Sequence, residues 1–187
     1  MKLTALRAVA LGAMLSISAF STYALADNPM VGGAPMLATK NIIENAVNSA
    51  DHTTLVAAVK AAGLVDTLEG KGTFTVFAPT NEAFAALPAG TVDNLLKPEN
   101  KAMLVKILTC HVVAAKALST DVMAMVKADG GSHVVDTVGG CKLTLKVDGG
   151  KVTVTDESGG VANVTIADVI QSNGVIHVID KVLLPKM

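Results

Sequence analysis

The sequence predicts an α+β fold, in which helices occupy the first part of the chain and strands the last part. Apolar residues recur at helical spacing in most segments between residues 41 and 129. From Gly130 onward, short runs rich in Val, Ile and Thr are separated by glycine-containing turns, which is typical of consecutive strands. Helices followed by strands favour an α+β arrangement over a parallel doubly wound sheet, because the latter alternates the two along the chain.

The N-terminus has the three parts of a secretory signal. Lys2 and Arg7 give a positive start, residues 8–20 form an apolar run, and residues 24–26 are a small-residue cleavage site. An uncleaved membrane anchor is the alternative, but the apolar run is short for a bilayer. We therefore expect residues 1–26 to be a signal peptide and the protein to be secreted or periplasmic.

The composition of the mature chain, which would begin at Asp27 after cleavage behind Ala26, excludes several classes of function. Without Lys2 and Arg7 the chain has 13 basic and 16 acidic residues, so it lacks the basic surface of a nucleic-acid binder. It has three Phe and no Tyr or Trp, so platforms for stacking bases or sugar rings are nearly absent. None of the glycine pairs lies in the strand, glycine loop, lysine and helix order of a phosphate loop, and we expect no cofactor.

One domain is predicted after the signal. Residues 27–39 contain two prolines and a glycine pair without any apolar period, and we expect a flexible leader there. Residues 40–187 are long enough for a single core, which Val, Leu, Ile and Ala would fill.

Apolar spacing predicts five longer helices. They cover residues 41–50, 53–62, 91–97, 98–109 and 119–129. Gly63 is expected to end the second helix, because glycine accepts the left-handed conformation common after a helix. Ser119 is expected to cap the last helix, because its hydroxyl can accept a hydrogen bond from an unpaired backbone N–H.

Residues 73–80 alternate with a period of two and predict a strand. The two faces of this strand would be Phe74, Val76 and Ala78 on one side, and Thr73, Thr75 and Phe77 on the other. Pro79 is expected to stop the strand, and Thr80 or Asn81 to cap a short helix over residues 82–87.

Five later runs are predicted to be strands. They cover residues 132–138, 141–147, 151–156, 163–170 and 175–184. The last run is apolar on both faces over most of its length, which is typical of a central, buried strand.

Two blocks stand out together, FTVFAPTNEAF at 74–84 and NGVIHVIDKVLLP at 173–185, with ILTCHVV at 107–113 between them. In this order and spacing they resemble the first block, the central Tyr-His segment and the second block of the fasciclin (FAS1-type) domain family, in particular its single-domain secreted bacterial members. The resemblance covers residues 41–185. It implies a compact wedge of about seven β-strands with flanking α-helices, and a role in adhesion or protein contact without catalysis.

The resemblance also implies structural roles for the residues of these segments. They are Thr75, Phe77, Ala78, Pro79, Thr80, Asn81, Phe84, His111, Asn173, Gly174, His177 and Asp180. In physical terms the first block is a corner between a strand and a helix, and the second block is a buried strand. We interpret both as folding signatures and expect no catalytic residue among them.

Cys110 and His111 are neighbours, so they could be a nucleophile with its base, half of a metal site, or two structural residues. Adjacent side chains point to opposite faces of a strand and lie about 100° apart on a helix, so the pair is a poor thiolate–imidazole dyad. The other histidines, His52, His133 and His177, show no metal-ligand spacing, and we expect no metal. The resemblance implies that His111 is a buried imidazole, hydrogen-bonded to backbone or to a hydroxyl.

Cys110 stands where the family commonly has tyrosine, and Cys141 is the only other cysteine. An even pair in an exported protein suggests a disulfide. Closure of a loop of about thirty residues would stabilise the fold by about 3–4 kcal/mol on the chain-entropy account. The alternative is a pair of separated, buried thiols that act as small apolar side chains.

In animal matrix members of the family, an Asp followed by Ile and another aliphatic residue, just before the second block, is an integrin-recognition motif. Asp168, Val169 and Ile170 lie at the matching positions and are a candidate partner contact. The alternative is an ordinary strand with Val164, Ile166, Asp168 and Ile170 on one face.

Three functions follow from these observations. The first is an exported, non-catalytic protein that mediates adhesion or contacts in the cell envelope or matrix, with a surface or matrix protein as partner and no transmembrane segment in the mature chain. The second is a carrier of a small apolar ligand, a pigment or lipid, which requires an apolar cavity on the order of 300 Å³ or more. The third is a thiol-dependent hydrolase, which requires Cys110 to be reduced, exposed and close to a distant histidine.

Overall fold

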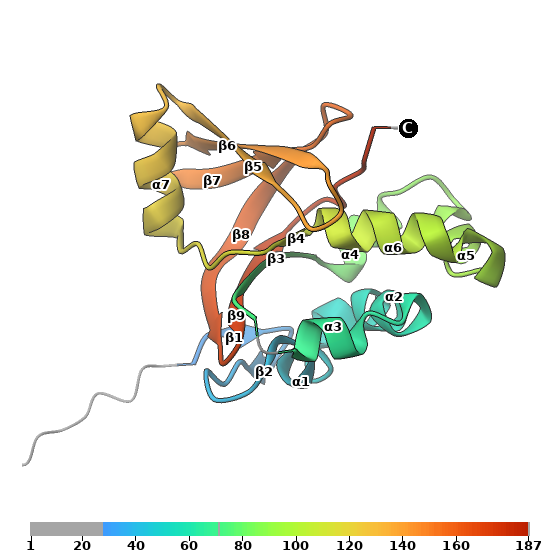
Figure 1. Cartoon of the computed structure of the whole chain (residues 1–187). Helices are drawn as coiled ribbons and strands as arrows, with labels where there is room; N and C mark the ends of the chain where they lie inside the picture. Colours follow the sequence, from blue (N-terminus) through green and yellow to red (C-terminus); the bar gives the residue numbers. More distant parts are fainter. Residues whose placement is uncertain (1–27, 71, 187) are drawn as a thin grey trace, which may run out of the picture.

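The computed structural model of the protein describes residues 28–70 and 72–186 (Figure 1), and the predicted signal peptide lies outside these residues. The helices are α1 (Ile42–Ala46), α2 (Thr53–Ala62), α3 (Val65–Glu69), α4 (Asn81–Ala85), α5 (Thr91–Leu95), α6 (Lys101–Cys110) and α7 (Ser119–Ala128), with 3-10 helices η1 (Ala50–His52) and η2 (Pro98–Asn100). The strands are β1 (Met30–Val31), β2 (Ala34–Pro35), β3 (Phe74–Pro79), β4 (Val112–Val113), β5 (Ser132–Asp136), β6 (Lys142–Asp148), β7 (Lys151–Thr155), β8 (Val161–Gln171) and β9 (Gly174–Ile179). No helix in the described part of the chain is both long and apolar enough to cross a bilayer.

Seven strands form one sheet in the order β4-β3-β9-β8-β7-β6-β5. β3 and β9 run parallel although they lie far apart in the sequence, and the other neighbouring pairs are antiparallel. β9 lies between β3 and β8, and all six of its residues are buried. The predictions of an α+β fold and of a central, buried last strand are therefore confirmed.

The two faces of the sheet pack into two hydrophobic cores. Alternation along β3 sends Val76 and Ala78 into the first core and Phe77 into the second, as the sequence predicts. The first core lies between the sheet and helices α1 to α6. The second core lies between β6–β8 and α7, which contributes Val122 and Val126. Figure 1 shows α7 beside β5–β7, apart from the other helices.

The predicted helices before α7 are present: α2 has the predicted bounds, whereas α1 and α5 are shorter than predicted. α2 ends at Gly63, whose φ of +73° is the left-handed conformation expected of a helix-ending glycine. α4 begins directly after Thr80, and the Thr80 hydroxyl oxygen accepts a hydrogen bond from the Ala83 N–H (3.2 Å). The helix predicted over 98–109 is divided into η2 and α6.

The start of α7 differs from the prediction that Ser119 caps it. Ser119 is already the first residue of the helix. The Leu118 N–H just before it donates to Asp121 Oδ2 (3.0 Å), so an acidic side chain in the first turn satisfies this end of the helix. Ser119 is bonded instead to Asp168 of β8, which attaches α7 to the sheet.

Residues 28–39 are packed against the domain, in contrast to the flexible leader that the sequence predicts there. β1 and β2 form a short hairpin closed by two glycines with positive φ. Val31 in β1 and Met36 directly after β2 are only 3% and 2% exposed and belong to the first core. A Cβ at Gly32 would lie 2.6 Å from the Asp51 backbone nitrogen, so glycine allows the hairpin to approach η1 closely.

Candidate functional site

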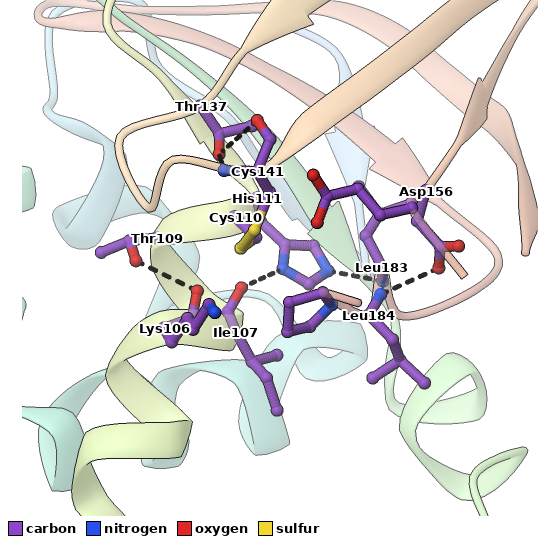
Figure 2. The surroundings of a disulfide bond; sticks show 12 residues. Lys106, Ile107, Thr109, Cys110, His111, Thr137, Cys141, Asp156, Leu183 and Leu184 are labelled. Carbon is purple, nitrogen blue, oxygen red and sulfur yellow. Dashed lines mark hydrogen bonds between the residues drawn. A yellow bond between two sulfur atoms is a disulfide. The ribbon is translucent and has the colours of Figure 1, made fainter. Parts of the chain in front are cut away.

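Cys110, the last residue of α6, is joined by a disulfide to Cys141, just before β6 (Figure 2). The two Cα atoms are 5.3 Å apart, an ordinary distance for a disulfide, and both side chains are buried. The turn before Cys141 packs on the end of α6, where the Gly139 N–H donates to the Thr109 carbonyl oxygen (3.0 Å). The bridge therefore connects a helix of the first core to a strand of the second and leaves Cys110 without a thiol.

The His111 ring lies between α6 and the C-terminal segment (Figure 2). Its Nδ1 donates to the Ile107 carbonyl oxygen (2.8 Å), and its Nε2 accepts from the Leu183 N–H (2.9 Å). A carbonyl oxygen can only accept, so the ring is neutral with its proton on Nδ1. Burial lowers the pKa of His111 to about 4, an effect that the Ile107 carbonyl and the Asp156 charge offset only in part. Both nitrogens are bonded within the fold, so His111 connects two segments and is not placed to act as a base.

The C-terminal segment, residues 181–186, is held by side chains. The sequence predicts a strand up to residue 184, but β9 ends at residue 179. Beyond it, the Leu184 N–H donates to Asp156 Oδ2 (2.9 Å), as Figure 2 shows. Val182 packs into the first core and Leu183 into the second. The apolar run therefore continues because the segment fills two cores, although strand pairing has ended.

Asp168 forms a second polar centre with Ser119 and His177. Its carboxylate accepts hydrogen bonds from the Ser119 N–H (2.6 Å) and from the Ser119 hydroxyl. The Asp168 N–H donates to His177 Nδ1 (3.2 Å), and His177 Nε2 donates to the Ala117 carbonyl oxygen (2.9 Å). Burial lowers the pKa of His177, against the opposing effects of the Ala117 carbonyl and Asp168. Ser, His and Asp meet here, but the histidine bonds backbone groups at both nitrogens, unlike the base of a nucleophilic triad.

The predicted faces of β8 are wrong from Ile166 onward, because Val164 belongs to the second core whereas Ile166 packs against the first. The register of β8 against β9 shifts on both sides of Ile166, and Asp168 has the only positive φ (+59°) among described non-glycine residues. Val169 is consequently buried in the first core, whereas Ile170 is 41% exposed. Asp168 and Ile170 thus do not continue the face of Val164. Of the candidate contact residues Asp168, Val169 and Ile170, only Ile170 has an exposed side chain.

The polar residues of the first block hold neighbouring segments in place. Thr75 Oγ1 donates to the Ala115 carbonyl oxygen (2.6 Å) and accepts from the Ala117 N–H (2.9 Å). Asn81 Oδ1 accepts from the Thr54 N–H in the first turn of α2 (3.0 Å). Most of the apolar side chains of the block are buried, among them Phe77, Ala78, Pro79 and Phe84. Thr80 caps α4, so these residues serve the corner between β3 and α4 or the segments around it.

The second block is equally internal. Asn173 Oδ1 accepts from the Ile42 N–H (3.1 Å) at the start of α1, and its Nδ2 donates to a carbonyl oxygen of α3 (2.6 Å). A Cβ at Gly174 would collide with the backbone of β3, which runs alongside. Asp180 Oδ1 accepts from the Asn163 N–H (2.7 Å) of β8. Within both blocks, polar side chains are used to join backbone segments.

Comparison with known proteins identifies the family. The sequence model of the Fasciclin domain matches residues 50–185. The chain belongs to the fasciclin domain family. It is 48% identical over 184 residues to Protein sll1483 of Synechocystis sp., covering 98% of this chain and 94% of that relative. It is 40% identical over 131 residues to Transforming growth factor-beta-induced protein ig-h3 of Sus scrofa, covering 70% of this chain and 17% of that protein.

The fold of this fasciclin domain agrees with a solved structure. The FAS1 domain pair of the insect cell adhesion molecule Fasciclin I matches with a TM-score of 0.70 at 19% sequence identity. The match covers 78% of this chain and 51% of that chain. The seven-stranded sheet with flanking helices, which the resemblance implies, is therefore confirmed.

One face of this fasciclin domain combines exposed valines with half-buried threonines. Val134, Thr144, Thr155 and Val161 are register partners across β5, β6, β7 and β8. Their neighbours along β6 and β7 point into the second core beneath α7, so these four side chains lie on the opposite face of the sheet. Val134 and Val161 are 52% and 43% exposed. We call this row of four residues the Val–Thr face.

The sequence reasoning did not single out the Val–Thr face. In the sequence, Thr alternates with apolar residues in β6 and β7, and this alternation indicates that one face of these strands is solvated. Which residues of four strands align in one row depends on register, and hairpin register is decided by turns and partners.

Metal chemistry finds no support in the described residues. Among residues 28–70 and 72–186, no group of three or more His, Cys, Asp and Glu side chains is arranged to hold a metal ion. His133 pairs with Asp129 at the end of α7 (2.6 Å), a contact between two surface groups.

Proposed function

We propose that this fasciclin domain is an exported, non-catalytic module that mediates adhesion or protein contacts in the cell envelope or matrix, with the Val–Thr face as its contact surface. The observation that carries the proposal is the face itself. Two exposed valines, Val134 and Val161, flank two threonines in one row across four strands. Exposed apolar side chains that are aligned in this way favour burial against another protein.

Two further observations support a contact function. Thr75 and Asp180 of the two family blocks, and His111 between them, are bonded inside the domain, so these side chains are not free to bind a partner or a substrate. The solved structure that this chain resembles in fold comes from a protein described as a cell adhesion molecule. A surface or matrix protein is therefore the class of partner that we propose, and its contact would be made by the sheet.

The two other candidate functions are less well supported. A pigment or lipid carrier requires a cavity on the order of 300 Å³, whereas the apolar cavity of the first core has a volume of about 60 Å³. A thiol-dependent hydrolase requires a free Cys110, which is bonded to Cys141.

The contact surface is tested by capturing partners from the native cell envelope with the tagged, exported protein. The Val134→Lys/Val161→Lys double variant places two charges on the Val–Thr face. Val47→Lys is the matched control, because Val47 is 48% exposed at the end of α1 and lies away from the face. We expect partners to be recovered at least tenfold less with the double variant and at an unchanged level with the control. Equal recovery with all three proteins would contradict the assignment of the face.

Export has its own test. The protein isolated from the periplasm or medium should begin at Asp27, as read by intact mass. A chain found only in the cytoplasm with its first 26 residues intact would refute export without bearing on the Val–Thr face.

A further inference from the structure

β5 is an edge strand of the seven-stranded sheet, and only β6 pairs with it. The opposite edge is β4, which has two residues and pairs with β3. Short strands, proline, lysine and bulges are the usual means by which proteins keep a sheet edge from pairing with another chain. β5 has none of these features: it is five residues long, contains neither proline nor lysine, and pairs with β6 without a register shift.

The backbone groups of Ser132, Val134 and Asp136 point away from β6. In an antiparallel pair, residues that bond to the neighbouring strand alternate with residues whose N–H and C=O point outward. The Thr137 N–H donates to the Cys141 carbonyl oxygen just before β6 (2.9 Å), so the odd-numbered residues of β5 bond to β6 and the even-numbered ones do not. Among the described residues, no hydrogen bond satisfies the outward N–H and C=O groups of these three residues.

The free part of this edge has defined ends. Before β5, the Gly131 N–H donates to the Val126 carbonyl oxygen (2.8 Å), where the chain leaves α7. After β5, the Val138 N–H donates to the Val112 carbonyl oxygen of β4 (2.8 Å). The five residues between these bonds are open to another strand, and the Val134 side chain at their centre is 52% exposed.

We propose that β5 pairs with β5 of a second copy of this chain, antiparallel and about a two-fold axis at Val134. In this register Val134 lies opposite Val134 of the second copy, and Ser132 lies opposite Asp136. Every outward N–H of one strand then meets an outward C=O of the other. A shift by two residues in either direction would leave the groups at one end of each strand unpaired, so the symmetric register forms the most hydrogen bonds.

The side chains of β5 and β6 favour a second copy over an unrelated extended peptide. Ser132, Val134 and Asp136 lie on one face of β5, so the Ser132 hydroxyl of one copy can donate to the Asp136 carboxylate of the other. Asp136 is paired with Lys142 of β6 (3.0 Å), and Lys146 is the register partner of Ser132. Across the junction the order is therefore lysine, serine, carboxylate and lysine. No two like charges face each other, whereas an unrelated peptide would meet the same backbone groups without this match.

Pairing would make one continuous sheet from two copies. The two-fold axis between the paired strands is perpendicular to the sheet, so the Val–Thr faces of both copies lie on the same side. The pairing uses the backbone of β5 and does not depend on what the Val–Thr face binds. Two five-residue strands are small beside the roughly 1,200–2,000 Å² of a stable interface, so the dimer is weak and forms where the protein is concentrated.

Amide hydrogen exchange tests both the pairing and its register. The full mature protein is measured by NMR at concentrations well below and well above the dissociation constant obtained from sedimentation equilibrium. We expect exchange of the Ser132, Val134 and Asp136 amides to slow by about tenfold or more at the high concentration, because each gains a partner. The His133 and Val135 amides, which are already bonded to β6, should not change.

Two variants of one residue separate backbone pairing from side-chain contact. Val134→Pro removes an outward N–H and no bond to β6, and proline is tolerated on an edge strand in this orientation. Val134→Thr keeps the N–H. We expect the dissociation constant to rise by about tenfold or more in Val134→Pro, because both bonds at the axis are lost, and by about threefold or less in Val134→Thr. Val161→Lys, which changes the Val–Thr face on β8, should leave the dimer intact.

Four results would overturn the proposal. They are a monomer at every concentration up to the solubility limit, a dimer whose exchange is unchanged at Ser132, Val134 and Asp136, a dimer that Val134→Pro does not weaken, and a dimer that Val161→Lys abolishes. The last result would mean that two copies meet through their Val–Thr faces. If Val134→Pro does not fold, the alternating exchange pattern of the unmodified protein still decides. A monomer would leave the capture of envelope partners by the Val–Thr face unaffected, so the two proposals can fail separately.

Discussion

Acidification should destabilise this fasciclin domain through His111. The neutral ring donates to Ile107 and accepts from the Leu183 N–H, and a second proton would remove the acceptor on Nε2. Its pKa is lowered to about 4 in the folded protein, against 6.5 as the ordinary value. Between these two pH values the unfolded chain binds more protons than the folded chain. Stability is therefore present in full above pH 6.5 and is lost as the pH falls towards 4.

The size of the effect follows from the same two pKa values. The difference between 6.5 and about 4 corresponds to about 3 kcal/mol of unfolding free energy, since one pKa unit is about 1.4 kcal/mol. About 2 kcal/mol of this is lost between pH 7 and pH 5. Asp156, which faces the ring from beyond the C-terminal segment, makes protonation easier and is already included in that pKa.

Urea unfolding at pH 7, 6 and 5 measures this contribution. His111→Gln should be less stable than the unmodified protein at pH 7 by about 2–3 kcal/mol, because two buried backbone groups lose their partners. Between pH 7 and pH 5 it should lose about 2 kcal/mol less than the unmodified protein does. Met103→Gln, at an exposed and non-titrating residue of α6, is the control and should retain the original pH dependence. An unchanged pH dependence in His111→Gln would refute the reasoning, because His52 and His177 are present in all three proteins.

Further predictions concern the bridge, the attachment of α7 and the close approach of β3 and β9. On reduction, the oxidised protein should gain two daltons and two alkylatable thiols, and thiols that alkylate without reductant would disprove the bridge. The Cys110→Ser/Cys141→Ser variant should have an unfolding free energy, measured in urea, that is lower by about 3–4 kcal/mol, because the bridge joins residues 31 positions apart. Asp168→Asn should speed hydrogen exchange in the first turn of α7 by about tenfold or more, because a hydrogen bond to a charged group contributes about 1.5–3 kcal/mol. An equal change in exchange rate along the whole of α7 would argue against this. Gly174→Ala should lower the unfolding free energy by more than about 3 kcal/mol or prevent folding, because the new Cβ would collide with the backbone of β3. Gly149→Ala, where the Cβ would enter open space, should lower it by about 1 kcal/mol. Equal losses of stability in thermal unfolding would contradict this.

Local patterns predicted the regular elements well. The alternation in residues 73–80 placed Val76 and Phe77 on opposite faces, and they lie in different cores. Gly63 correctly predicted the end of α2, because the end depends only on the left-handed backbone conformation of that one residue. Such features depend on neighbours along the chain, which the sequence contains directly.

Features decided by distant partners could not be predicted. The irregularity in β8 arises where Asp168 bonds Ser119 and His177, residues 49 and 9 positions away. Nothing in the segment around Asp168 distinguishes it from an ordinary alternating strand. The β1–β2 hairpin escaped detection for a similar reason, because the burial of Val31 and Met36 depends on the first core and not on any local period.

The buried polar side chains of this domain bond mainly to the backbone of its irregular segments. Irregular buried segments carry N–H and C=O groups that need partners, because neither a helix nor a strand supplies them. His111 and Asp156 provide those partners for the C-terminal segment, and Thr75 and His177 provide them for the connection before α7. Each of these side chains is thereby committed to a fixed backbone group. A contact with another molecule must then be made by surfaces that the fold leaves free, and in the described residues the alternation of β5–β8 leaves such a surface opposite α7.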